Sequence, residues 1–109
     1  MLFDFTKLDI KKLENLYGGE KAVETKGYID DDIKILMGRL EPGASIGEHE
    51  HNPGFEVLYI VEGCGKILIE GERVPIHAGM CHYCKTGSGH SLINDSDEDL
   101  IYFAVITLK

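Results

Sequence analysis

One stretch of the chain indicates its fold: residues 43–63, with the sequence GASIGEHEHNPGFEVLYIVEG. His49 and His51 are two positions apart, so both side chains leave the same face of a β-strand. The turn residues 52–54 then reverse the chain, and Glu56 can point back toward the two imidazoles. Imidazole and carboxylate groups together suit a borderline transition metal. The stretch therefore predicts a metal centre, which the distant His90 would complete.

Short β-like runs separated by turn residues fill the chain from Tyr28 onward. The expected strands span residues 33–40, 55–61, 65–69, 73–76, 80–84, 91–94 and 100–108. Turn signals at intervals of roughly eight to twelve residues are typical of an antiparallel sandwich or barrel. Several runs are apolar on both faces. One face can fill the barrel, and the other needs a further layer or a partner subunit, so we expect a homodimer.

The first 27 residues are expected to form a segment that packs on the outside of a barrel built from residues 28–109. Within residues 9–17, apolar side chains follow helical spacing, and Gly18-Gly19 then ends the pattern. We therefore expect a short amphipathic helix in this region.

The composition is that of one compact domain. Of the 109 residues, 43% are hydrophobic and 28% are charged, which is ordinary for a folded soluble protein. No apolar run approaches the roughly 20 residues that cross a bilayer, and the N-terminus is a poor secretory signal. The three cysteines are too few, and odd in number, for a disulfide framework. The expected location is the cytoplasm.

The formal net charge of −8 bears on the possible partners. It disfavours nucleic acid and anionic membrane surfaces, because both would be repelled. Two acidic clusters, at residues 30–32 and 95–99, are interpreted as solvated loop tips. Neither has the alternating Asp pattern with a Gly and a later Glu that a calcium loop needs. The expected partner is a small molecule.

Two spaced patterns make the chain similar to the cupin family. The first family signature is matched without a gap by Gly43-x5-His49-x-His51-x4-Glu56-x6-Gly63. The second is matched by Gly79-x5-Lys85-Thr86-Gly87-x2-His90-x3-Asn94, with Lys85 where the family has proline. Two such motifs in the right order form a far more specific signal than a lone His-x-His pair.

This resemblance, which covers residues 33–107, implies an all-β fold, a double-stranded β-helix or jelly-roll barrel with a short N-terminal helical segment. It also implies that one divalent metal ion is held inside the barrel by His49, His51, Glu56 and His90. Manganese, iron, cobalt, nickel and zinc all suit such a ligand set. The missing proline at position 85 affects the rigidity of a turn and no ligand.

Small cupins that the chain resembles include isomerases, lyases and decarboxylases, and dioxygenases. The resemblance therefore implies a metal-dependent enzyme acting on a small polar metabolite, with His82, Tyr83 and Tyr59 as candidates for proton transfer. The alternative is a non-catalytic module that captures a carboxylate or a sugar through its metal. A second titratable group near the ligand would favour the enzyme.

Two further residues are candidates for substrate binding, Arg39 and Phe55. If Arg39 faces the interior, its guanidinium would anchor a carboxylate or a phosphate; otherwise it is a surface arginine paired with an acid. In residues 81–84, His82 and Cys84 share one strand face and Cys81 and Tyr83 the other. One of these pairs should line the barrel.

Overall fold

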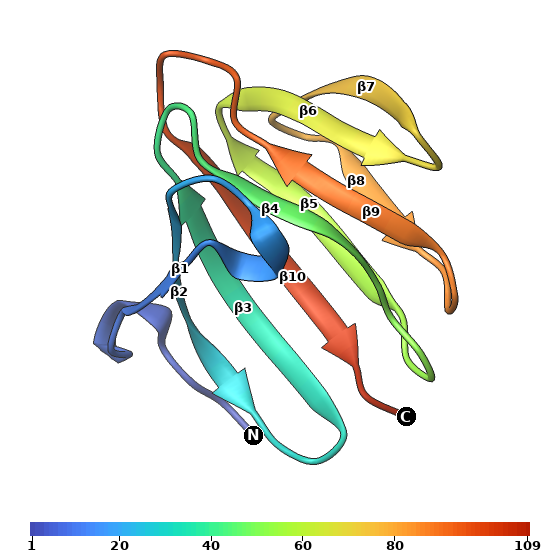
Figure 1. The fold of residues 1–109 in the computed structure, drawn as a ribbon. Helices are drawn as coiled ribbons and strands as arrows, with labels where there is room; N and C mark the ends of the chain where they lie inside the picture. Colours follow the sequence, from blue (N-terminus) through green and yellow to red (C-terminus); the bar gives the residue numbers. More distant parts are fainter.

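The computed structural model describes all residues 1–109, which form two antiparallel sheets that face each other (Figure 1). The larger sheet contains, in spatial order, β1 (Lys11–Glu14), β2 (Ala22–Ile29), β3 (Ile33–Leu40), β10 (Leu100–Thr107), β5 (Glu56–Glu62) and β8 (Cys81–Cys84). The smaller sheet contains β4 (Ser45–Glu50), β9 (Gly89–Ile93), β6 (Cys64–Ile69) and β7 (Glu72–His77). This is the expected double-stranded β-helix.

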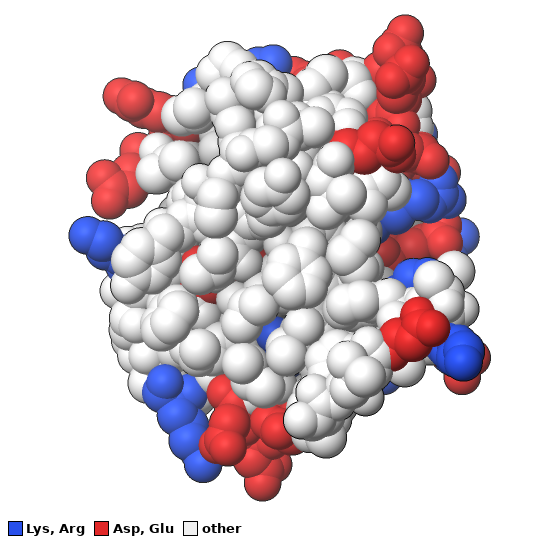
Figure 2. Space-filling view, turned by 180° about the vertical axis from the view of Figure 1, so that it is seen from behind, with Lys and Arg blue, Asp and Glu red and all other residues white.

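The outer face of the six-stranded sheet is largely apolar. Along β5 and β10, Leu58 and Ala104 point inward and are buried, so their neighbours Tyr59 and Phe103 point outward. Figure 2 shows the molecule from behind: charged side chains gather at the margins, and the middle is mostly uncharged. The six-stranded sheet is thus apolar on both of its faces, as the runs that are apolar on both faces predict from the sequence.

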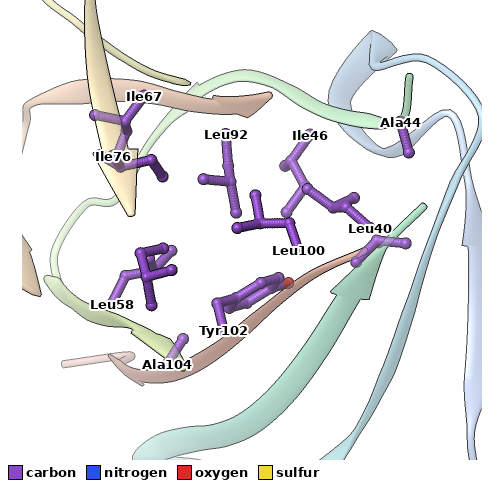
Figure 3. Packing of buried hydrophobic residues seen from close by; sticks show 12 residues of the cluster. Leu40, Ala44, Ile46, Leu58, Ile67, Ile76, Leu92, Leu100, Tyr102 and Ala104 are labelled. Atoms are coloured by element: carbon purple, nitrogen blue, oxygen red, sulfur yellow. The ribbon is translucent and has the colours of Figure 1, made fainter. Parts of the chain in front are cut away.

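The hydrophobic core lies between the two sheets (Figure 3). The side chains that meet there come from alternate positions of facing strands, among them Leu40, Ile46, Leu58, Ile67, Leu92 and Leu100. A buried polar residue ties one end of this core together. The Nδ2 atom of Asn94 donates hydrogen bonds of 2.8 Å to the carbonyl oxygens of Leu40 and Glu98.

The prediction of a regular helix over residues 9–17 is wrong. The helical content consists of two short 3-10 turns, η1 (Phe5–Lys7) and η2 (Leu16–Gly18), and Lys11–Glu14 pairs with β2 as strand β1. An isolated helix of this length is marginal, whereas the edge of β2 offers a ready row of hydrogen-bonding groups. Strand β2 itself, Ala22–Ile29, begins before the first strand expected from the sequence.

The turn η2 docks on the edge of β4 through two glycines. A Cβ atom on Gly19 would lie 2.1 Å from the carbonyl oxygen of Ser45, and one on Gly47 would lie 1.9 Å from that of Tyr17. The backbone of Ser45 also bonds to the carbonyl of Glu20, at 3.0 Å. Only glycine allows this close approach.

None of the helical turns has the length and hydrophobicity of a membrane-crossing helix.

Candidate metal centre

Four side chains converge where the smaller sheet faces β5. His49 lies on β4, and the strand register places it directly opposite His90 of β9. His51 follows β4 immediately, and the turn at residues 52–54 carries the chain across to the other sheet. There Glu56 is the first residue of β5. The reversal inferred from the sequence is therefore the step that brings a carboxylate of one sheet to the imidazoles of the other.

The donor atoms of these side chains are close together. The Nε2 atoms of His51 and His90 lie 3.0 and 2.8 Å from the Oε1 atom of Glu56. The Nε2 atoms of His90 and His49 lie 3.1 Å apart. Three imidazole nitrogens and one carboxylate oxygen thus surround a single point.

The ring of His49 is held in place from two sides. Its Nδ1 atom lies 2.8 Å from the carbonyl oxygen of Gly47, so Nδ1–H donates there and Nε2 keeps its lone pair for the cluster. The ring of Tyr17 stacks on that of His49, with centroids 4.2 Å apart and an interplanar angle of 12°. Burial lowers the pKa of His49, against the opposing effect of the Gly47 bond. The neutral imidazole needed for a metal is therefore favoured.

Glu56 is a buried carboxylate that stays ionised. Burial raises the pKa of its carboxyl group, but the hydrogen bonds from His51 and His90 outweigh this effect and bring the pKa to about 2, against an ordinary value of 4.5. An acceptor-only carboxylate inside a barrel is costly unless cations or donors surround it. Here the imidazoles supply hydrogen-bond donors, and a bound cation would stabilise the carboxylate by its charge.

These residues fit a transition-metal ion. All four ligand atoms lie within 4.8 Å of one another. Bonds of about 2.1 Å from one ion to neighbouring corners of an octahedron put the donor atoms about 3 Å apart, close to the separations found here. The four residues predicted from the sequence therefore form one group that could hold a metal ion.

A cavity of about 400 Å³ opens beside this group, and its walls contain residues that the sequence did not single out. Besides the four candidate ligands, its polar lining includes Lys11, Tyr17, Thr25, Lys34 and Tyr102. All five lie outside the motifs: four lie on strands, where register decides which face each occupies, and Tyr17 lies in the turn η2. Alternation along β3 and β10, counted from the buried Leu40 and Leu100, would have placed Lys34 and Tyr102 inside.

Four of the residues predicted to act on a substrate do not line this cavity. Tyr59 and Tyr83 point outward, with 42% and 56% of their surfaces exposed. Phe55 packs edge-on against Tyr83, with ring centroids 5.6 Å apart. Arg39 lies on the outer face and forms ion pairs with Glu24, at 2.7 Å, and with Asp99. The reason is strand parity: each of these residues alternates with a buried neighbour.

His82 does lie between the sheets, but not in the metal-side cavity. Its ring centroid is 5.3 Å from that of His90, and it lines a separate apolar groove of about 260 Å³. Its Nε2 atom is the one fully buried side-chain nitrogen or oxygen that lacks a hydrogen-bond partner. His82, Cys84 and His90 form a second group whose potential ligand atoms lie within 4.8 Å of one another. Within β8, His82 and Cys84 therefore point inward between the sheets, and Cys81 and Tyr83 point outward.

Comparison with known proteins agrees with this geometry. The oxalate-binding protein of Thermotoga maritima is 32% identical, over 99% of this chain and 94% of that protein. The β-alanine degradation protein BauB of Pseudomonas aeruginosa is 29% identical, over 78% of this chain and 92% of that protein.

Solved structures share the fold. A structure from Thermotoga maritima, described as a predicted oxalate decarboxylase, superposes with a TM-score of 0.92 at 30% identity, over the whole of both chains. That of KdgF from Halomonas sp. superposes with a TM-score of 0.82 at 16% identity, over 100% of this chain and 94% of the other. The sequence model of the Cupin domain family matches residues 36–106, well over half of the chain. The chain belongs to the cupin family.

Proposed function

We propose that this cupin binds one divalent transition-metal ion through His49, His51, Glu56 and His90, and uses the ion to hold a small carboxylate. The observation that carries the proposal is the convergence of four donor atoms within 4.8 Å of one another at the wall of a cavity. Four ligands leave room in an octahedral shell for oxygen atoms of a ligand, so the ion can act as a Lewis acid toward them.

The charge of the cavity supports an anionic ligand. A divalent ion and the ionised Glu56 together carry one positive charge. Lys11 and Lys34 also line the cavity, and neither forms an ion pair with an acid. The only other charged residue in the lining is Glu50. In a chain with a net charge of −8, a cavity of positive sign favours a carboxylate over a neutral sugar.

The named relatives support the same ligand class. One is called an oxalate-binding protein and covers nearly the whole chain, and a solved structure that is 30% identical over both whole chains is described as a predicted oxalate decarboxylase. Oxalate chelates metal ions through two carboxylate oxygens, which suits an ion with adjacent open positions. Oxalate is therefore the first ligand to test.

Elemental analysis and calorimetry test the proposal. The purified protein is expected to carry about one equivalent of a transition metal and to bind oxalate only when loaded. His51→Ala should remove most of the metal, because only three ligands remain and one of them, Glu56, loses the hydrogen bond from His51. His77→Ala is the matched control, since His77 is exposed and outside the cavity. Equal metal content in both variants would contradict the assignment.

Turnover of the bound carboxylate is a second candidate, through decarboxylase or other lyase, isomerase or dioxygenase chemistry. It is favoured by the unpaired Nε2 atom of His82 beside the ring of His90. Decarboxylation of the oxalate monoanion would give formate and carbon dioxide, with the proton retained on formate. Both products can be measured after incubation with the metal-loaded protein. Binding without either product supports the non-catalytic function. Products that the unmodified protein forms and the His82→Gln variant does not form support catalysis.

We also propose that two copies of the chain associate through the outer face of the six-stranded sheet. That face presents Tyr59, Val61 and Tyr83, each more than two-fifths exposed, and its middle is mostly uncharged (Figure 2). Two chains that each carry a charge of −8 repel each other least where charge is scarce. A second copy of the same apolar face is thus the occupant that the charge distribution favours.

A further inference from the structure

Three residues form a row across the inner face of the six-stranded sheet, on the side of the cavity away from the histidine-bearing strands. The strand register places Tyr102 of β10 beside Gly38 of β3, and Gly38 beside Thr25 of β2. Tyr102 and Thr25 are 3% and 7% exposed, and both line the cavity that holds the metal group.

Gly38 makes the room in which the tyrosine side chain lies. A Cβ atom at position 38 would be 2.1 Å from the Cζ atom of Tyr102 and 2.4 Å from its hydroxyl oxygen. The ring therefore lies across Gly38, and its hydroxyl end extends toward β2, where Thr25 stands. Figure 3 shows the ring reaching from β10 toward β3, with the oxygen at its far end.

The side chains of Tyr102 and Thr25 are buried, but their hydroxyl oxygens are not fully enclosed, and neither takes part in a side-chain hydrogen bond of the structure. Both hydroxyls are therefore unpaired within the chain and open to the cavity, where a ligand can accept from them. Covering a glycine in a sheet requires only an aromatic ring, and phenylalanine would serve equally well. The hydroxyl of Tyr102 thus has no structural task within the chain. Burial raises the pKa of Tyr102, so this hydroxyl keeps its proton and can donate.

We propose that the hydroxyls of Tyr102 and Thr25 form a second anchor for the ligand and donate hydrogen bonds to the carboxylate oxygens of a dicarboxylate that the metal ion leaves free. This inference rests on the proposed function and extends it: it names the residues that distinguish a dicarboxylate from a monocarboxylate. Lys11 pairs with Thr25 in the strand register and adds a cation at the open end of the same row.

Calorimetry on the metal-loaded protein tests the inference. The probes are acetate, which has one carboxylate, and oxalate, malonate and succinate, which have two at increasing separation. In Tyr102→Phe, the affinity for the tightest dicarboxylate is expected to fall about ten-fold, the effect of one hydrogen bond to a charged group. Acetate affinity and metal content should not change. Thr25→Val should weaken the same dicarboxylate and likewise leave acetate unaffected.

Tyr28→Phe is the matched control, because it also removes one tyrosine hydroxyl. That hydroxyl donates to Asp30, at 2.9 Å, outside the cavity. If Tyr102→Phe keeps its metal and binds every dicarboxylate as tightly as the unmodified protein, the inference is overturned and the proposed function stands. If the unmodified protein takes up metal but none of the carboxylates, both are overturned together.

Discussion

Glu56 is the residue through which the two sheets share one chemical site. The three histidines belong to β4, the residue after it, and β9, whereas Glu56 comes from the opposite sheet and is 5% exposed. Its single Oε1 atom lies within 3.0 Å of two imidazole nitrogens. A change at this position therefore alters the charge of the cluster and the contact between the sheets.

Because its pKa in the folded chain, about 2, lies below the ordinary 4.5, ionised Glu56 stabilises the metal-free protein. This stabilisation is fully present above about pH 4.5 and is lost as the pH falls toward 2, and its upper bound is about 3 kcal/mol. Glu56→Gln lacks the titrating group. The difference in melting temperature between the chelator-treated parent and this variant should shrink across that window. Curves that stay parallel would contradict the prediction.

Tyr17 covers one face of His49, and its own surface is 58% exposed. Tyr17→Ala should leave the four ligands in place but open a path for water and chelators. We expect the metal content to be unchanged after purification and the rate of metal loss to a chelator to rise several-fold. The matched control is Val74→Ala, which shortens an exposed apolar side chain outside the cavity and outside the proposed dimer interface. Equal rates of loss in the two variants would show that Tyr17 does not shield the ion.

At the scale of elements, strand positions were predictable where turn residues bracket an apolar run. The strand expected at residues 33–40 is confirmed to the residue as β3, and β10 ends one residue earlier than expected. The ligand group was predictable because its spacing is local to two motifs. The N-terminal strands were not, because β1 and β2 pair with the strands that follow them but contain few of the apolar residues that mark a strand. The cavity walls were missed because strand register decides which residues face the cavity.

The contact between η2 and β4 is the element-scale feature most sensitive to one methyl group. Gly47→Ala would place a Cβ atom 1.9 Å from the carbonyl oxygen of Tyr17, so η2 has to move. We expect a loss of about 1–3 kcal/mol in the free energy of unfolding, the usual range for overpacking. Gly89→Ala is the control, since the nearest atom there is 3.8 Å away. Thermal or urea unfolding of the metal-free proteins measures both, and equal losses would argue against tight docking.

At the scale of the whole molecule, the proposed dimer depends on the apolar outer face of the six-stranded sheet. Light scattering should give a mass twice that of the 12.1 kDa chain. The double variant Tyr59→Glu, Tyr83→Glu places four like charges in the proposed interface and should shift the mass to that of one chain. Val74→Glu is the control on the other sheet, where the valine is 38% exposed. A monomeric parent protein would contradict the proposed interface.

Four polar residues that line the cavity come from an earlier part of the chain than the candidate metal ligands. The candidate metal ligands all fall within residues 36–106, which match the family, whereas Lys11, Tyr17, Thr25 and Lys34 all precede that region. Substitutions in the first 35 residues can therefore change which molecule enters the cavity, while the strands that carry the candidate ligands stay the same. Orthologues that keep every histidine could therefore differ in the ligand they prefer. Exchanging residues 1–35 between two such orthologues would then transfer that preference.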